Sequence, residues 1–147
     1  MRNHITSIAA LLIGSLITGQ SATAKTVHVS PSGNDAWSGQ YNQPNMDRTD
    51  GPVATLTRAR DIIRQWKSAN PLDEPVRVIV ADGVYWITEP LVLTPQDSGT
   101  QSCPISYENA PNASPVIAGG KIITDFQLTE NGIWKTEIPA AAAGQWQ

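Results

Sequence analysis

The fold is decided by the stretch VRVIVADGVYWI (76–87) and by the three short apolar runs that follow it, LVL (91–93), PISYE (104–108) and PVIAGG (115–120). Turn-forming residues close each run, and no helical pattern separates one run from the next. Short strands that succeed one another without helices are typical of an all-β solenoid or barrel and suit an α/β domain poorly. We therefore predict that an all-β architecture begins at residue 76.

One segment before this stretch, residues 55–69, has the period of an amphipathic helix. Thr55 is expected to cap its start and Asn70-Pro71 to end it, because proline lacks the N–H that would continue the helix. The open end of a solenoid exposes apolar side chains and unpaired strand groups, so we expect the helix to cover that end. The rival arrangement is a helix that flanks the sheet in a single βαβ unit. The residues on the apolar face are Leu56, Ala59, Ile62, Ile63 and Trp66.

The alternation of apolar and turn residues predicts strands on both sides of the helix. Trp134 is expected to pack in one of them. Cys103 is the only cysteine, which excludes an intrachain disulfide, and is expected to be a small buried residue. Residues 25–75 then form a strand, a polar loop and the capping helix, and residues 76–147 form the first coils. The predicted strands are 26–30, 76–81, 84–87, 91–93, 105–107, 116–118, 122–126 and 132–138.

Residues 1–24 have the pattern of a secretory signal peptide. Arg2 provides a positive start, residues 8–17 an apolar core, and Ala22-Thr23-Ala24 the small-x-small pattern, so we expect cleavage after Ala24. A membrane-spanning anchor is the alternative, but small and polar residues interrupt an apolar stretch that is shorter than the roughly 20 residues a bilayer requires. The chain is therefore expected to be a secreted or periplasmic bacterial protein without a stable membrane anchor.

The charge of the chain is mildly acidic, with a formal net charge of −3. Loss of the signal peptide removes Arg2 and no acid, which leaves nine basic and thirteen acidic residues. A nucleic-acid-binding protein would instead show clustered lysine and arginine. We expect a monomer that does not bind nucleic acid.

Five motifs follow one another along the chain. They are VSPSGND (29–35), GPVATLTRAR (51–60), VIVADGVY (78–85), LVLTPQDSGT (91–100) and PVIAGG (115–120). Their order resembles the amino-terminal region of secreted bacterial right-handed parallel β-helix proteins that act on polysaccharides. The resemblance is strongest to the β-helix enzymes of glycoside hydrolase family 141, although β-helix polysaccharide lyases open in a similar way. It implies that this chain is the capped start of a right-handed parallel β-helix, truncated before the coils that carry catalysis.

This resemblance implies a parent glycoside hydrolase acting on a complex polysaccharide, with the fragment itself inactive and its catalytic residues unknown. A polysaccharide lyase and a non-catalytic carbohydrate-binding or surface β-helix protein are the alternatives. Polysaccharide or oligosaccharide is the expected partner in each case.

Glycoside hydrolysis needs two carboxyl groups across the scissile bond. The acids of the predicted coils are Asp82, Glu89, Asp97 and Glu108. Asp82 and Asp97 stand in turns, where a carboxylate accepts backbone hydrogen bonds, so we expect them to be structural. A lyase would need a base near carboxylates that hold Ca²⁺. Arg77 is the only basic residue between positions 76 and 120, and we expect it on the solvated face of its strand.

Aromatic residues are the candidates for sugar contact, because pyranose rings stack on exposed aromatic faces. We name Trp37, Tyr85 and Trp86 as candidate substrate-binding residues. Tyr85 and Trp86 are neighbours in a predicted strand, so one of them must face outward.

No cofactor or metal is expected, with Ca²⁺ as the one option considered. The oxygen ligands of such a site would come from the polar loop, at Asn34, Asp35, Asp47 and Asp50, but their spacing matches no EF-hand pattern.

Overall fold

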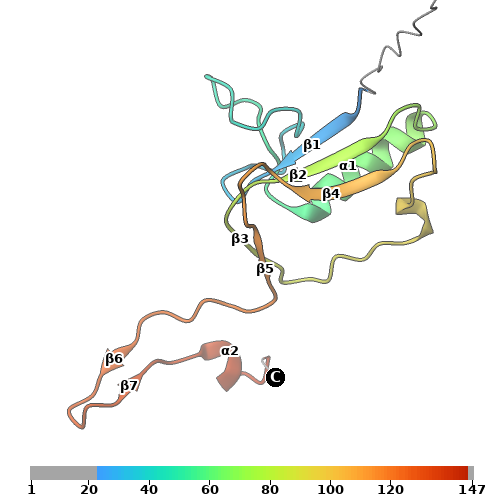
Figure 1. Ribbon diagram of the computed structural model, residues 1–147. Helices are drawn as coiled ribbons and strands as arrows, with labels where there is room; N and C mark the ends of the chain where they lie inside the picture. Colours follow the sequence, from blue (N-terminus) through green and yellow to red (C-terminus); the bar gives the residue numbers. More distant parts are fainter. Residues whose placement is uncertain (1–22, 146–147) are drawn as a thin grey trace, which may run out of the picture.

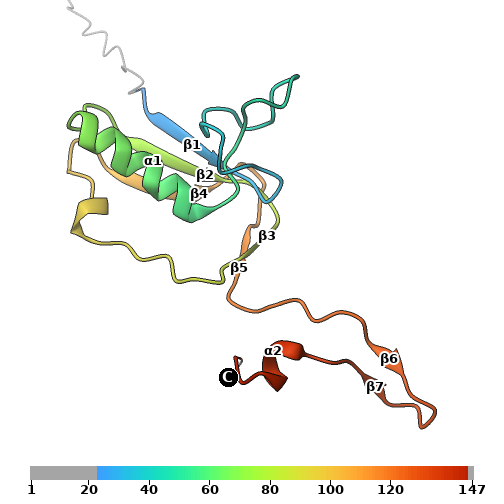
Figure 2. The same cartoon turned by 180° about the vertical axis from the view of Figure 1, so that it is seen from behind.

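The computed structural model describes residues 23–145 (Figure 1, Figure 2). The predicted signal peptide lies outside the described residues except for Thr23 and Ala24. Among residues 23–145 no helix is long and apolar enough to cross a bilayer. The elements are β1 (Lys25–Val29), α1 (Leu56–Ala69), β2 (Val76–Val80), β3 (Val84–Trp86), the 3-10 turn η1 (Pro95–Asp97), β4 (Ile105–Asn109), β5 (Val116–Ala118), β6 (Gln127–Leu128), β7 (Trp134–Lys135) and α2 (Pro139–Ala142).

Two parallel ladders organise the strands. One sheet has the order β1-β2-β4, and a second pairs β3 with β5. Val27, Val78 and Tyr107 stand in register across the first sheet, and Tyr85 stands beside Ile117 in the second. The chain therefore passes from the first sheet to the second by way of β2 and β3, and then repeats the passage one strand further by way of β4 and β5.

The fold is mixed, with parallel strands and few helices, so the prediction of an all-β chain with one helix was right only in part. The connection β1-α1-β2 joins two parallel neighbouring strands through a helix, which is the single βαβ unit considered as the rival arrangement. Figure 2 shows α1 lying along one face of the three-stranded sheet. Because strands β2 to β5 follow without another such helix, the βαβ unit does not repeat.

The core lies between α1 and the sheet. Alternate residues of β1 and β2 point toward the helix, as the two-residue period of a strand requires. The helix presents the apolar face that its sequence predicts, and Trp66 and Ile105 pack partly buried at the margin. The buried core consists of Val27, Val29, Val53, Leu56, Ala59, Ile62, Ile63, Val76, Val78, Val80 and Tyr85.

The predicted ends of α1 are confirmed. The Thr55 hydroxyl accepts a hydrogen bond from the Arg58 N–H at 3.0 Å, and the Asn70 N–H donates to the Trp66 carbonyl at 3.0 Å. Cys103 is buried, as expected.

Three strand predictions were wrong. Residues 91–93 and 122–126 form no ladder, and the strand expected over 132–138 contracts to the two residues of β7. An apolar run is stabilised as a strand only when a partner strand lies beside it, and neither 91–93 nor 122–126 belongs to a sheet. Trp134 is 64% exposed rather than packed, because the β6–β7 hairpin projects from the core.

The two edges of the three-stranded sheet differ. The loop 30–53 covers the outer edge of β1. There the His28 N–H donates a hydrogen bond to the Gly39 carbonyl at 2.7 Å, and the Val53 N–H donates one to the His28 carbonyl at 2.9 Å. At the opposite edge, β4 is the last strand of the described sheet, and Tyr107 is 38% exposed. One edge is thus closed by the chain, and the other is open.

Candidate functional site

A groove of about 300 Å³ lies between the start of α1 and the segment 84–91. We call it the β3 groove. It combines two aromatic side chains, one carboxylate and several hydroxyls. Its lining residues are Pro31, Ala54, Thr55, Leu56, Thr57, Val84, Tyr85, Trp86, Ile87, Thr88, Glu89 and Leu91.

The adjacent aromatic residues of β3 face opposite ways. Trp86 is 47% exposed, whereas Tyr85 is 6% exposed and belongs to the core. The Tyr85 hydroxyl donates toward the carbonyl oxygens of Val29 at 3.1 Å and Ala81 at 2.9 Å. Tyr85 was a candidate for sugar stacking, and its burial leaves little of its ring accessible for such a contact. Burial, with the nearby Asp82 carboxylate, raises the pKa of Tyr85 to about 12, so the phenol is neutral.

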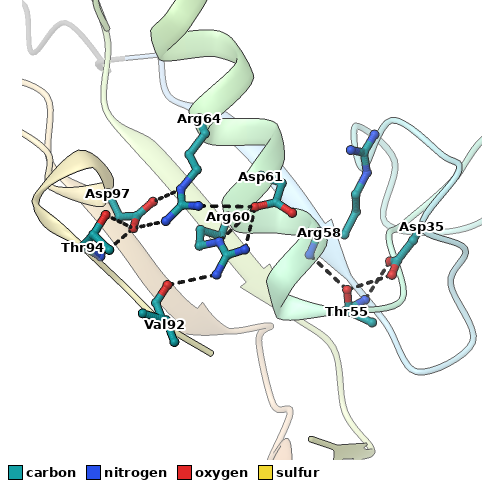
Figure 3. A network of polar contacts seen from close by, with 9 residues as sticks. All are labelled: Asp35, Thr55, Arg58, Arg60, Asp61, Arg64, Val92, Thr94 and Asp97. Carbon is teal, nitrogen blue, oxygen red and sulfur yellow. Dashed lines mark hydrogen bonds and ion pairs between the residues drawn. The ribbon is translucent and has the colours of Figure 1, made fainter. Parts of the chain in front are cut away.

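A carboxylate fixes the wall of the groove at the start of α1 (Figure 3). Asp35 accepts hydrogen bonds from the backbone N–H groups of Ala54 at 2.7 Å and Thr55 at 2.9 Å, and from the Thr55 hydroxyl at 2.8 Å. The same hydroxyl caps the helix. Asp35 therefore holds in place two residues that line the groove.

Three cations of α1 fix the segment that follows the opposite wall, and Figure 3 shows two of them, Arg60 and Arg64. Arg60 donates to the Val92 carbonyl at 2.9 Å. Arg64 forms two hydrogen bonds to Asp97, at 2.6 and 2.7 Å, and Lys67 donates to the Ser98 carbonyl at 2.7 Å. The Arg64 guanidinium holds the pKa of Asp97 well below its usual range. These bonds tie a segment with no strand partner to the helix.

Glu89 is the one acidic residue that lines the groove, and no lysine, arginine or histidine lines it. The groove therefore has the means to accept and donate hydrogen bonds and carries negative charge. A single carboxyl group does not make a glycosidase site, which requires two.

The other acids of the coil region are engaged elsewhere. Asp82 accepts a hydrogen bond from the Ser114 N–H at 3.0 Å. Glu108 accepts two hydrogen bonds from Arg77, at 2.6 and 3.0 Å. The Arg77 side chain is 51% exposed, which confirms its expected place on the solvated face.

Trp37 is half-buried in the loop 30–53. A Cβ atom placed on Gly51 would lie 2.7 Å from the Trp37 ring, so the ring rests on that glycine. Trp37 lies outside the lining of the β3 groove, and its contact with sugar stays a prediction.

Two of the residues considered as calcium ligands, Asp50 and Asn34, form hydrogen bonds within the loop itself, and Asp35 binds the start of α1. Asp50 accepts from the Ser38 N–H at 2.7 Å, the Ser38 hydroxyl at 2.8 Å and the Gly51 N–H at 2.8 Å. Asn34 accepts from the Ala36 N–H at 2.9 Å. In the part of the chain that the structure describes, no group of three His, Cys, Asp or Glu side chains is placed to hold a metal ion.

Thr88 and Glu89 follow Trp86 within three residues, whereas Thr55 and Thr57 reach the groove only through the tertiary fold. From the sequence, Glu89 was predicted only as an acid of the coils and Thr55 only as a helix cap. Their spacing did not indicate that they line the same groove. The one local signal is that Glu89-Pro90 ends the extended run just after Trp86.

Comparison with known proteins gives one informative match. No protein-family model matches the chain, and no curated protein matches it. A solved structure described as "Glycoside hydrolase" is similar, with a TM-score of 0.62 and 27% sequence identity. The similarity covers 73% of this chain and 17% of that one. The chain thus resembles part of a glycoside hydrolase, which indicates a carbohydrate-active relation.

Proposed function

We propose that this chain is the amino-terminal part of an extracytoplasmic carbohydrate-active protein built on a right-handed parallel β-helix, and that the whole protein is a glycoside hydrolase acting on a complex polysaccharide. The similarity to 17% of a glycoside hydrolase carries the proposal. The activity of the matched protein is proposed here for the longer parent, and the chain itself is expected to be inactive.

The strand arrangement supports the β-helix. Repeated passage through β2-β3 and β4-β5 places successive strands in parallel register, which is how the coils of such a solenoid stack. The loop 30–53 closes the edge at β1, whereas the edge at β4 and β5 is open. At this open edge, Val116 and Ile117 of β5 are 53% and 58% exposed. A following coil would pair with this open edge and bury these side chains.

Export is the second part of the proposal. Cleavage after Ala24 would make Lys25 the first residue of the mature chain, and Lys25 is also the first residue of β1. The ordered structure would then begin directly at the new terminus. Amino-terminal sequencing of secreted material should start at Lys25, and a protein that starts at Met1 would contradict export by a cleaved signal.

A lyase is the alternative in the same fold, and a non-catalytic binding protein is another. Arg77 is the one basic residue between positions 76 and 120, and it is paired with Glu108 on the next strand. The described residues therefore give no support to a lyase that acts on uronate sugars.

The test begins with the gene downstream of Gln147, followed by expression of its full-length product. Incubation with neutral and uronate polysaccharides should release reducing ends without an unsaturated product that absorbs in the ultraviolet. Calcium-dependent formation of that product would identify a lyase and overturn the hydrolase proposal. Glycan binding without turnover would favour the non-catalytic alternative.

A further inference from the structure

We infer that the β3 groove binds one pyranose unit of a neutral glycan, with Trp86 as the stacking surface and Glu89 as an acceptor for sugar hydroxyls. The choice of a sugar as ligand rests on the proposed function. The neutral character of that sugar rests on the charges of the groove.

The size of the groove suits a single ring. Its volume of about 300 Å³ lies at the lower end of the roughly 300–1,000 Å³ that small-molecule sites occupy. Apolar side chains form much of the wall, and the polar groups are few and convergent, as in most small-molecule sites.

Trp86 is presented by a fixed strand. It pairs in register with Ala118 of β5, whose small side chain leaves the neighbouring position unobstructed. Tyr85, next to it, is anchored in the core by two hydrogen bonds from its hydroxyl. An exposed indole held in this way loses little conformational entropy when a ring stacks on it.

The polar groups define the chemistry of the ligand. Glu89 accepts hydrogen bonds, and the hydroxyls of Thr57 and Thr88 both donate and accept, whereas the Thr55 hydroxyl already donates to Asp35. No lysine, arginine or histidine lines the groove, and Arg60 of α1 is already committed to Asp61 and to the Val92 carbonyl. A uronate or a sulfated sugar would bring its anion toward Glu89 without a partner, so the groove discriminates against acidic glycans.

The experiment is a calorimetric and NMR titration of the 147-residue chain with a panel of neutral hexose and pentose oligosaccharides and with oligogalacturonate. We expect neutral oligosaccharides to bind and oligogalacturonate to bind at least about tenfold more weakly. Trp86→Ala removes the stacking surface and should weaken neutral binding by at least about tenfold, which corresponds to about 1.4 kcal/mol in the free energy of binding. Trp86→Phe should restore part of it.

Two matched variants serve as controls. Trp134→Ala removes an indole that is 64% exposed but lies outside the groove, and it should leave binding unchanged. Glu89→Gln should weaken neutral binding severalfold and strengthen oligogalacturonate binding, whereas Glu130→Gln, outside the groove, should do neither.

The inference is overturned if no neutral oligosaccharide of the panel binds to a chain whose amide spectrum shows it folded. It is also overturned if Trp86→Ala leaves binding intact, or if oligogalacturonate binds more tightly than every neutral oligosaccharide. These outcomes are separate from the test of the proposed function, because they are read as binding to this chain and require no hydrolysis. A parent without hydrolase activity would leave a Trp86-dependent sugar site standing.

Discussion

Arg64 of α1 forms a bidentate ion pair with Asp97 of η1. Its Nε lies 2.6 Å from Oδ1 and its Nη2 lies 2.7 Å from Oδ2 (Figure 3). The Asp97 side chain is only 8% exposed. It also accepts hydrogen bonds from the N–H of Thr94 at 2.7 Å and from its hydroxyl at 3.2 Å. One carboxylate thus closes the 3-10 turn and attaches it to the helix.

Asp97→Asn should destabilise the chain at neutral pH, because the amide keeps the shape but loses the charge that Arg64 pairs with. The pKa of Asp97 is lowered from 3.8 in the folded chain, so its contribution is present above about pH 4 and is lost as the pH falls. Urea unfolding at pH 7 and pH 3 should show a difference between variant and wild type that shrinks in acid. A difference of equal size at both pH values would exclude the charge as its cause. Asp47→Asn, at an exposed loop position, is the control.

Thr55→Ala removes the hydroxyl that caps α1 and accepts from the Arg58 N–H. The expected cost is about 1 kcal/mol in the free energy of unfolding, as for other helix caps. Thr57→Ala is the matched control, since Thr57 is exposed and forms no side-chain hydrogen bond among the described residues. Chemical denaturation of both variants gives the comparison, and an equal loss at both positions would argue against the cap.

The helix was predictable because its evidence is local. The period of residues 56–66, the hydroxyl of Thr55 and the proline after Asn70 all act within a few residues of the backbone they control. The strands β1 to β5 were predictable for the same reason, since alternation and turn residues mark them. Residues 91–93 show the limit of such evidence, because an apolar run does not contain its partner strand.

The β3 groove was not predictable, because it depends on placement across the chain. Tyr85 and Trp86 have equal claim to the outer face when only the sequence is known, and the ladder with β5 and the carbonyls of Val29 and Ala81 decide between them. Glu89 and Thr55 line the same groove because α1 packs on the sheet. Their spacing in the sequence does not indicate this shared position.

Gly33→Ala should destabilise the loop that closes the edge of β1. A Cβ atom at position 33 would lie within 2.5 Å of the Pro52 carbonyl oxygen, and backbone at that distance has to shift. Overpacking of this kind costs about 1–3 kcal/mol. Gly120→Ala is the control, because a Cβ atom there meets nothing within 4 Å. Thermal unfolding should separate the two variants, and equal melting temperatures would contradict the close approach of Gly33 to residue 52.

Tyr85→Phe tests the anchor beneath the β3 groove at two pH values. Near neutral pH, loss of the hydroxyl leaves two carbonyl oxygens with one donor fewer, which should cost about 1 kcal/mol. Burial raises the pKa of Tyr85 from 10.0 to about 12, so the unfolded chain releases this proton before the folded one does. The stability that Tyr85 provides is therefore complete below about pH 10 and is lost as the pH rises from there toward 12.

The variant should for this reason lose less stability than the wild type between pH 9 and pH 11, measured by urea unfolding at each pH. Burial also raises the pKa of Tyr107, so part of the alkaline loss should persist in the variant. Tyr41→Phe removes a phenol that is 52% exposed and should follow the wild type. An alkaline slope in Tyr85→Phe as steep as that of the wild type would show that the Tyr85 phenol ionises as readily in the folded chain as in the unfolded one.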